Sequence, residues 1–332
     1  MRTVAIIGAT GVVGQELLHC LNATNFPTDG DHLHLYASAR SAGKVIATPF
    51  GDKKIELFSV EAAGKADVVF LAVGGGFAKE HARALSAQGA IVIDNSSAFR
   101  YEEDVPLIVP EINADAIGDA KLISNPNCTT AILAMALWPI YQTFGLKRVI
   151  VSTYQATSGG GKACMDELRE QTQNYLEDKP VTHEHFAHPI PFNLIPQIDV
   201  FQDNGYTKEE MKVTWETRKI FGLPDLPISC TAVRIPTFRA HAESVTLETE
   251  KEVDLEKVRE ILASAQGVKL CDDQEKLLYP MPLTSTEQFD VEVGRIRAND
   301  VFGDRGLDFF VCGDQLLRGA ALNGVLIAHK CL

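Results

Sequence analysis

The feature that most restricts the fold of this chain is a glycine-rich turn near its N-terminus. An apolar run over residues 3–8 ends at Gly8, and residues 12–23 carry apolar side chains at helical spacing. Gly11 and Gly14 complete a GxxGxxG pattern with Gly8. A glycine turn between a strand and a helix lets a pyrophosphate approach the backbone N–H groups at the helix N-terminus. The pattern therefore predicts a dinucleotide-binding βα unit, and the alternative is a glycine turn that only closes an ordinary βα unit.

The segments after this turn predict a parallel sheet. Near-continuous apolar runs at 33–37, 67–73 and 90–95 alternate with helical stretches such as 77–88. Strands that are apolar along their whole length are typical of a parallel sheet that helices cover on both faces. Ligands of such sheets bind at the carboxyl ends of the strands. The first part of the chain is therefore expected to form a Rossmann-like α/β domain.

The pattern changes after Pro126. A long helix is expected at about 128–143, a strand at 148–155 and another helix near 207–220. Three later segments alternate in polarity with a period of two: ISCTAVRIP, ESVTLETEKEV and FDVEVGRIRAN. This alternation predicts a second, α+β domain with a mostly antiparallel sheet. The last segment, 313–330, is predicted to form an amphipathic helix.

Length and charge exclude several classes of protein. With 332 residues the chain is long enough for two domains. Its net charge of −13 argues against nucleic acid and anionic membranes as partners, because both bind basic surfaces. The N-terminus enters a strand at once, which leaves no room for a signal peptide. The 7 cysteines are scattered and never form a CxxC pair, which is typical of reduced thiols in a cytoplasmic protein.

The turn after the second predicted strand indicates which dinucleotide is bound. An NAD-binding domain is expected to carry an Asp or Glu here, which accepts hydrogen bonds from the ribose hydroxyls. This chain instead has Ser38, Arg40 and Ser41, with no acid in the turn. An arginine and two hydroxyls would bind a 2′-phosphate that a carboxylate would repel. The turn therefore predicts NADP, and a solvated surface arginine is the alternative.

Cys128 is the cysteine whose neighbours most suggest chemistry. It follows Pro126 and Asn127 at the predicted start of the long helix, and two threonines come next. A helix N-terminus stabilises the thiolate, which is the nucleophilic form of cysteine. Asn127 and the threonines could donate hydrogen bonds to an oxyanion. One hypothesis for Cys128 is a nucleophile, and the other is a buried cysteine that packs at the start of a core helix.

His241 is the histidine best suited to acid–base chemistry. Arg234 and Arg239 precede it and Glu243 follows it in a strand-and-turn context. Most single histidines are structural, but a cysteine nucleophile and a hydride acceptor would need a general acid or base beside them. Arg234 could bind a substrate carboxylate through two hydrogen bonds.

His183, His185 and His188 are the other histidines that could have a chemical role. They form the segment HEHFAH and are candidate metal ligands. A zinc site would need a further ligand at suitable spacing, and the sequence offers no convincing one. Surface histidines in a Pro-bearing loop are the preferred interpretation, and no metal is predicted.

In combination, these motifs resemble the aspartate-semialdehyde dehydrogenases. The matching segments occur in the family's order and span nearly the whole chain. They are GATGVVG (8–14), ASARSAG (37–43), DNSSAFR (94–100), VPEIN (109–113), SNPNCTT (124–130), YQATSGGG (154–161), RIPTFRAHAE (234–243) and GDQLLRGAAL (313–322). The combination is far more specific than any single motif.

The resemblance implies a reaction and a role for each matching residue. The reaction is the reversible reductive dephosphorylation of L-aspartyl-4-phosphate by NADPH, an early step towards lysine, methionine, threonine and isoleucine. Cys128 matches the family's nucleophile, His241 its acid/base, and Gln155 the residue that orients the acyl intermediate. The implied substrate-binding residues are Arg100, Asn127, Glu209, Lys212 and Arg234. The implied cofactor-binding residues are Gly8, Thr10, Gly11, Val12, Val13, Ser38, Arg40, Ser41, Ser158, Gly159 and Gln315.

The resemblance also implies how the domains are organised. An NADP-binding domain of residues 1–127 would be completed by a C-terminal helix at 313–332, and residues 128–312 would form the catalytic and dimerisation domain. Family members are usually homodimers or homotetramers.

Two other functions remain as alternatives. An N-acetylglutamyl-phosphate reductase shares the two-domain plan, but the amine of its substrate is blocked, so that enzyme would need no acid such as Glu209. A non-catalytic paralogue would be expected to lose Cys128 or His241, and both are present.

Overall fold

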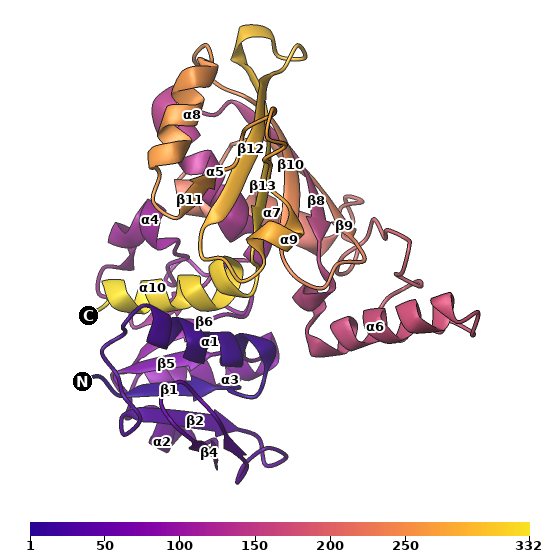
Figure 1. Ribbon diagram of the computed structural model, residues 1–332. Coiled ribbons are helices and arrows are strands. Elements are labelled where there is room, and N and C mark those ends of the chain that lie inside the picture. Colours follow the sequence, from indigo (N-terminus) through magenta and orange to yellow (C-terminus); the bar gives the residue numbers. More distant parts are fainter. The chain divides into compact units, whose positions relative to one another are not determined.

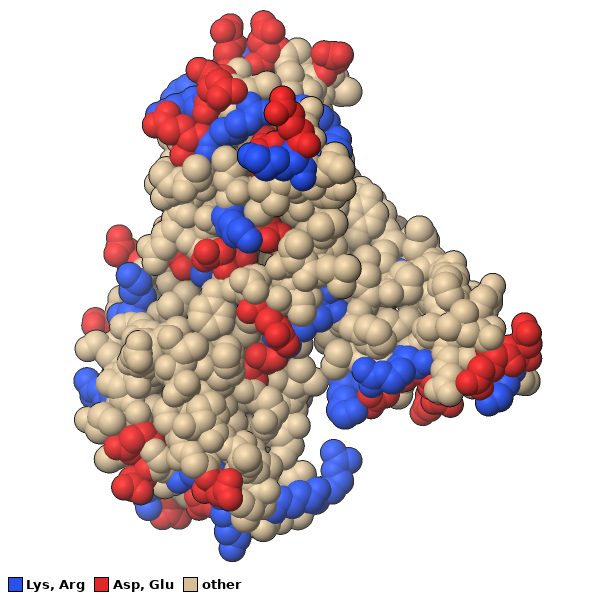
Figure 2. All heavy atoms as spheres, in the orientation of Figure 1, with Lys and Arg blue, Asp and Glu red and all other residues tan.

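The computed structural model describes residues 1–332, which divide into two compact units (Figure 1). The first unit combines Met1–Asn127 with Ala320–Leu332, and the second unit is Cys128–Gly319. The chain therefore leaves the first unit at Asn127 and returns to it at Ala320. None of the helices combines the length and the apolar character that crossing a membrane requires. On the face drawn in Figure 2, Lys and Arg side chains lie among Asp and Glu side chains.

A seven-stranded sheet in the order β3-β4-β2-β1-β5-β6-β7 forms the centre of the first unit. Its strands are β1 (Val4–Ile7), β2 (Leu33–Ala37), β3 (Val45–Ile46), β4 (Lys53–Leu57), β5 (Val68–Leu71), β6 (Ile91–Asp94) and β7 (Leu122–Ser124). All neighbours pair parallel except the short β3, which runs antiparallel to β4. Every residue of β1, β5 and β6 is buried, which explains their continuous apolar sequence. The predicted, mostly parallel sheet is confirmed.

The C-terminal segment is part of the first unit. The helices of this unit are α1 (Val12–Ala23), α2 (Val60–Ala63), α3 (Gly75–Ser86), α4 (Pro110–Asn113) and α10 (Leu322–Lys330), with a 3-10 turn, η1 (Ala114–Ile117). Helix α10 packs against α1 and β6 (Figure 1). The Asn323 side-chain amide donates to Oδ1 of Asn125 at 2.6 Å and to the carbonyl oxygen of Ile108 at 2.9 Å. These buried hydrogen bonds tie the end of the chain to the loops after β6 and β7.

The second unit contains a six-stranded mixed sheet in the order β11-β12-β13-β10-β8-β9. Its strands are β8 (Arg148–Gln155), β9 (Ile228–Arg234), β10 (His241–Glu248), β11 (Val268–Leu270), β12 (Val291–Ala298) and β13 (Gly306–Gly313). The β12–β13, β13–β10 and β10–β8 pairs are antiparallel, and the two outer pairs are parallel. The predicted, largely antiparallel sheet is confirmed, and the period-two segments lie in β9, β10 and β12.

Helices cover one face of this sheet. The helices of the second unit are α5 (Cys128–Phe144), α6 (Lys162–Leu176), α7 (Lys208–Phe221), α8 (Leu255–Ser264) and α9 (Pro282–Ser285), with short turns η2 (Thr157–Gly160), η3 (Gly303–Arg305) and the π-helical η4 (Leu317–Ala321) at its end. Helix α7 packs on β9, and α5 packs on β12 and β13. In β8 the residues that alternate with the buried Val149 and Val151 are exposed, namely Arg148 and Ile150. The covered face is therefore the one that carries Val151, Thr153 and Gln155.

The predicted helix at 313–330 is wrong over its first part. Gly313 is the last residue of β13, where it pairs with His241 of β10. The Asp314 carboxylate then accepts hydrogen bonds from the backbone N–H groups of Leu316 and Leu317, and from Nε of Arg239 at 2.6 Å. These bonds hold a turn rather than a helix start, and the regular helix begins only at Leu322. The amphipathic pattern extends across the turn because both segments are buried.

The glycine turn gives a first prediction. Gly8 has φ +90, and a Cβ there would lie 2.2 Å from the carbonyl oxygen of Ala72. Gly43 has a similar φ of +88 but has open space around it. We expect Gly8→Ala to lower the Tm by roughly 5 °C or more beyond the effect of Gly43→Ala, because only the first adds a clash to the backbone strain. Scanning calorimetry of both variants measures this, and equal Tm values would contradict it.

Candidate functional site

The register of three strands gathers predicted functional residues at one edge of the second sheet. Strands β8 and β9 run parallel, with Gln155 beside Arg234 where both strands end. Strand β10 runs antiparallel to β8, with Ala242 beside Tyr154, so its first residue lies at the same edge. That first residue is His241.

Cys128 is the first residue of α5, and its side chain is half-buried. The π-helical turn η4 forms the wall beside it. A Cβ on Gly319 of this turn would lie 2.6 Å from Cβ and 2.9 Å from Cα of Cys128. Only a glycine therefore allows the turn to pack this closely on the backbone of the cysteine. Short π-helical segments occur often at functional sites.

His241 is fully buried and its ring is neutral near pH 7. Its Nδ1 accepts a hydrogen bond from the backbone N–H of Ala156 at 3.0 Å, so the neutral ring carries its proton on Nε2. That Nε2 lies 3.4 Å from Nε2 of Gln155. Burial, followed by the positive charge of Arg234, lowers the pKa of His241 to about 3. The Nε2–H group therefore faces the edge where Gln155 and Arg234 lie.

Backbone groups hold His241 from both sides. Ala240 has φ +67, a conformation that is uncommon for residues other than glycine, and its N–H donates to Oε1 of Gln315 at 2.8 Å. Gln315 in turn donates to the hydroxyl of Ser158. A Cβ on Gly159 would lie 3.1 Å from Nε2 of His241 and 2.9 Å from Nη1 of Arg234. The bare backbone at Gly159 therefore covers both side chains.

Gln155 lies beside His241 and hydrogen-bonds to an acid on α7. Its Oε1 accepts from the hydroxyl of Thr153 at 3.0 Å, and its Nε2 donates to Oε1 of Glu209 at 3.2 Å. Helix α7 starts with a capping box formed by Thr207 and Glu210, which fixes its first turn. Glu209 lies in that turn and is buried.

Arg234 is a buried cation at the end of β9. Its Nη1 donates to the carbonyl oxygen of Ala156 at 2.5 Å. Burial lowers the pKa of Arg234, and the charges of Glu209, Cys128 and Cys164 act in the opposite direction. A guanidinium has five N–H donors, so Arg234 can keep this contact and still bind a carboxylate.

Lys212 lies one turn after Glu209 on α7 and has two anionic neighbours. Its Nζ is 3.0 Å from Oε2 of Glu209 and 2.8 Å from Oδ2 of Asp199. Burial acts to lower the pKa of Lys212, but the two carboxylates outweigh burial and raise it. The ammonium group is therefore charged although its side chain is mostly buried.

The first unit holds the residues predicted to bind the dinucleotide. Gly11 precedes α1 without a side-chain cap, so no side chain competes with an anion for the backbone N–H groups of the first turn. Thr10 is exposed beside it. Ser38 and Arg40 are exposed in the turn after β2, and Ser41 is buried with its N–H donating to the Ser38 carbonyl oxygen at 2.9 Å. This turn presents a hydroxyl and a guanidinium to solvent.

Two residues predicted to bind substrate also lie in the first unit. Arg100 is buried, and its Nε and Nη2 donate to the carbonyl oxygens of Asn125 at 2.8 Å and Asn95 at 3.0 Å. Asn127 is buried and is the last residue of the unit.

Comparison with known proteins shows the family. Residues 3–120 match the model for the NAD binding domain of semialdehyde dehydrogenase, and residues 137–318 match the model for its dimerisation domain. An aspartate-semialdehyde dehydrogenase of Aquifex aeolicus is 45% identical over 331 residues, which is 98% of this chain and 96% of the relative. That of Bacillus subtilis is 44% identical over 336 residues, with 98% and 96% covered.

The chain belongs to the aspartate-semialdehyde dehydrogenase family. A solved structure supports this. Aspartate semialdehyde dehydrogenase II of Vibrio cholerae, in a complex with ASA, has a TM-score of 0.94 and 39% identity to this chain. The match covers 99% of this chain and 98% of the Vibrio cholerae chain. The first unit therefore contains the NAD-binding domain of an aspartate-semialdehyde dehydrogenase, and the second unit contains its dimerisation domain.

Within this family framework, the structure brings together the predicted residues of the second unit. They lie at or beside the common edge of β8, β9 and β10: Cys128, Gln155, Ser158, Gly159, Glu209, Lys212, Arg234, His241 and Gln315. The remaining predicted residues belong to the first unit. The individual roles of all these residues stay predictions.

Two residues beside the site, Asp199 and Gly319, were not predicted from the sequence. Asp199 stands in a loop with no motif around it, and only its contact with Lys212 marks it. Gly319 lies within GDQLLRGAAL, but the predicted helix there concealed its close approach to Cys128. A glycine inside an otherwise helical pattern was the one available signal.

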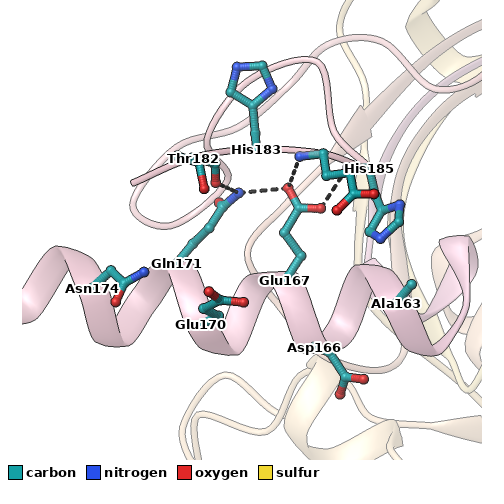
Figure 3. Close-up of a pocket in the computed structure, with 10 residues that line it drawn as sticks. Ala163, Asp166, Glu167, Glu170, Gln171, Asn174, Thr182, His183 and His185 are labelled. Atoms are coloured by element: carbon teal, nitrogen blue, oxygen red, sulfur yellow. Dashed lines mark hydrogen bonds between the residues drawn. The ribbon is translucent and has the colours of Figure 1, made fainter. Parts of the chain in front are cut away.

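The histidine-rich segment forms a pocket beside α6. His183 and His185 line it together with acidic side chains of the helix (Figure 3). Glu167 accepts hydrogen bonds from the backbone N–H of His185 at 2.7 Å and from the side-chain amide of Gln171 at 2.7 Å. This acid therefore holds the loop against α6. No group of three or more His, Cys, Asp or Glu side chains is placed to hold a metal ion.

The contact between Gly319 and Cys128 gives a second prediction. We expect Gly319→Ala to lower the kcat of the aspartate-semialdehyde dehydrogenase reaction by about 10²-fold, because the added methyl group must displace the backbone of Cys128. Gly324→Ala is the matched control, since a Cβ there meets no atom closer than 3.7 Å. Steady-state kinetics on both variants test this, and an unchanged kcat for Gly319→Ala would refute it.

The buried histidine gives a third prediction, which concerns acid stability. The pKa of His241 is about 3 in the folded chain against an ordinary value of 6.5, so the unfolded state binds its proton first as the pH falls. The contribution of the neutral ring to stability is complete above pH 6.5 and is lost progressively between 6.5 and 3, by about 2 kcal/mol at pH 5. We expect the Tm of the His241→Gln variant to fall less than the Tm of the unaltered chain when the pH is lowered from 8 to 5. Equal losses would contradict this.

Proposed function

We propose that the chain catalyses the reversible reductive dephosphorylation of L-aspartyl-4-phosphate to L-aspartate 4-semialdehyde and phosphate, with NADPH as the reductant. One observation carries the proposal: a cysteine at a helix start belongs to the same unit as a buried neutral histidine and a glutamine bonded to a buried acid. Membership of the family supports the same reaction. The reaction is a step in the biosynthesis of lysine, methionine, threonine and isoleucine.

Cys128 is the proposed nucleophile. Its position at the N-terminus of α5 favours the thiolate, because the helix dipole and the first-turn N–H groups stabilise negative charge. The thiolate attacks the carbonyl carbon of the acyl phosphate, a C–S bond forms, and the bond to the phosphate oxygen breaks. Gln155 orients the resulting thioester, since its amide is held by Thr153 and Glu209. A rigid amide is well suited to fix the acyl oxygen.

His241 is the proposed acid/base. When bound, the reduced nicotinamide supplies a hydride to the acyl carbon of the thioester. The Nε2–H of His241 then shares its proton with the thiohemiacetal oxyanion; as the C=O bond re-forms the proton returns to Nε2, the C–S bond breaks and Cys128 leaves as the thiolate. In the reverse direction the same N–H shares its proton with the oxyanion that forms when the Cys128 thiolate attacks the aldehyde.

Substrate recognition is proposed to use groups of opposite charge. Arg234 binds the α-carboxylate through two hydrogen bonds, and Glu209 binds the ammonium group. Lys212 binds the phosphate group. Arg100 and Asn127, in the first unit, keep the substrate-binding roles that the family resemblance implies. A net charge of −13 is compatible with this anionic substrate because the cations are local.

The first unit is proposed to bind NADP rather than NAD. The residues assigned to the cofactor there are Gly8, Thr10, Gly11, Val12, Val13, Ser38, Arg40 and Ser41. The glycine turn fits a pyrophosphate, because Gly8 has no side chain and α1 has no side-chain cap. The exposed Ser38 and Arg40 fit a 2′-phosphate. Ser158, Gly159 and Gln315 of the second unit complete the proposed set.

The larger organisation is also a proposal. Residues 1–127 with the C-terminal helix form the NADP-binding domain, and the catalytic domain also makes a homodimer or homotetramer, as its match to a dimerisation-domain model supports. The cytoplasmic location stays a prediction.

One assay tests the proposed function. Purified protein receives aspartate semialdehyde with NADP or NAD, with and without phosphate, and the absorbance of the reduced nicotinamide is followed. We expect NADP to be reduced only when phosphate is present. In Arg40→Ala we expect the KM for NADP to rise by a larger factor than the KM for NAD.

Cys128→Ala should abolish turnover and leave NADP binding nearly intact. Cys331 is another half-buried cysteine, so the Cys331→Ala variant is the control and should keep its activity. The absence of phosphate-dependent reduction would refute the proposal.

A further inference from the structure

Asp199 lies in the loop before α7, where its backbone conformation and its hydrogen bonds hold the side chain in one orientation. Its φ of +68 falls in the left-handed region, which residues other than glycine rarely adopt, although Asp and Asn tolerate it. The Gln197 side-chain amide donates to its carbonyl oxygen at 2.9 Å, and its own Oδ1 accepts from the N–H of Val200 at 2.8 Å. One carboxylate oxygen and the backbone are therefore used to fix the residue, and Oδ2 is left to face α7.

That second oxygen binds the ammonium group of Lys212. The distance from Nζ to Oδ2 is 2.8 Å, and the distance from Nζ to Oε2 of Glu209 is 3.0 Å. The side chain of Lys212 is only 13% exposed and that of Glu209 only 7%, against 31% for Asp199. Burial opposes the charge on Asp199, but the hydrogen bonds from Lys212 and the Val200 N–H, together with the charge of Lys212, outweigh burial and lower the pKa of this carboxyl. Asp199 and Lys212 are therefore charged near pH 7, and two carboxyl groups face the single ammonium group.

The arrangement limits how Lys212 can act on an anion. An ammonium group has three N–H donors. Two point to carboxylates here, so one remains for a further acceptor. An arriving phosphate would also be repelled by both carboxylates, and little water screens them because Lys212 and Glu209 are mostly buried. Glu209 also bonds to Gln155, whereas Asp199 meets the site through Lys212.

We propose that Asp199 is a positioning residue that fixes the ammonium group of Lys212 and weakens its hold on phosphate, so that phosphate is bound loosely enough to leave. This rests on the proposed role of Lys212 as a phosphate-binding residue. Phosphate is a product in one direction of the reaction, so an unopposed buried ammonium would hold it in the ground state without helping the chemical step.

The test separates the effect of the negative charge of Asp199 from the effect of its hydrogen bond to Lys212. Asp199→Asn removes the charge and suits the positive φ, and its single oxygen can accept from either Nζ of Lys212 or the Val200 N–H. We expect its KM for phosphate to fall about three- to tenfold, with an unchanged KM for aspartate semialdehyde and no rise in kcat. Asp199→Glu keeps the charge and should stay near the original KM for phosphate. Asp199→Gly also removes the charge and relieves the backbone, so it serves if the asparagine variant fails to fold.

Two controls distinguish this inference from the proposed function. Asp273→Asn neutralises an aspartate that is equally exposed at 31% and also paired with a lysine, and it should leave the KM for phosphate unchanged. Lys212→Met should raise that KM. If Lys212→Met leaves it unchanged, the proposed role of Lys212 fails. If Lys212→Met raises it, but neither Asp199→Asn nor Asp199→Gly lowers it, the inference about Asp199 is overturned and the role of Lys212 stands.

Discussion

The site in the second unit depends on the pairing register of β8, β9 and β10. Gln155 and Arg234 are neighbours because two parallel strands end together, and His241 joins them because an antiparallel strand begins there. Side chains alternate between the two faces of a sheet, so a shift by one residue would turn His241 to the opposite face. Val151 and Val245 pair on the covered face and are almost fully buried. The packing of this core therefore enforces the register that assembles the site.

Burial determines which groups at this edge are charged. His241 is neutral because its ring is completely buried and lies near a cation. Glu209, Lys212 and Asp199 also lie partly or wholly out of solvent, but each has a partner of opposite charge within 3.0 Å. A buried charge is tolerated only with such a partner. The edge therefore combines a neutral imidazole with charged groups that have partners of opposite charge.

Local patterns predicted much of the fold because they report burial directly. The continuous apolar runs of β1, β5 and β6 and the alternation in β9, β10 and β12 match their positions in the two sheets. The same periodicity was misleading between Gly313 and the start of α10 at Leu322, where Asp314 holds a turn through Arg239, a residue 75 positions away in sequence. Periodicity cannot register a hydrogen bond between distant segments.

The residue pattern was sufficient to predict the two sheet types, the glycine turn, the acid-free turn after β2 and the cysteine at a helix start. Each of these depends on neighbours within a few residues, so a local pattern contains the information. Glu209 and Lys212 came only from the family resemblance, and Asp199 and Gly319 from neither source. The contact of Asp199 with Lys212 and the packing of Gly319 on Cys128 are seen only in the folded chain. The physical reason is that these contacts join separate loops and helices, whose approach is set by the packing of the whole unit.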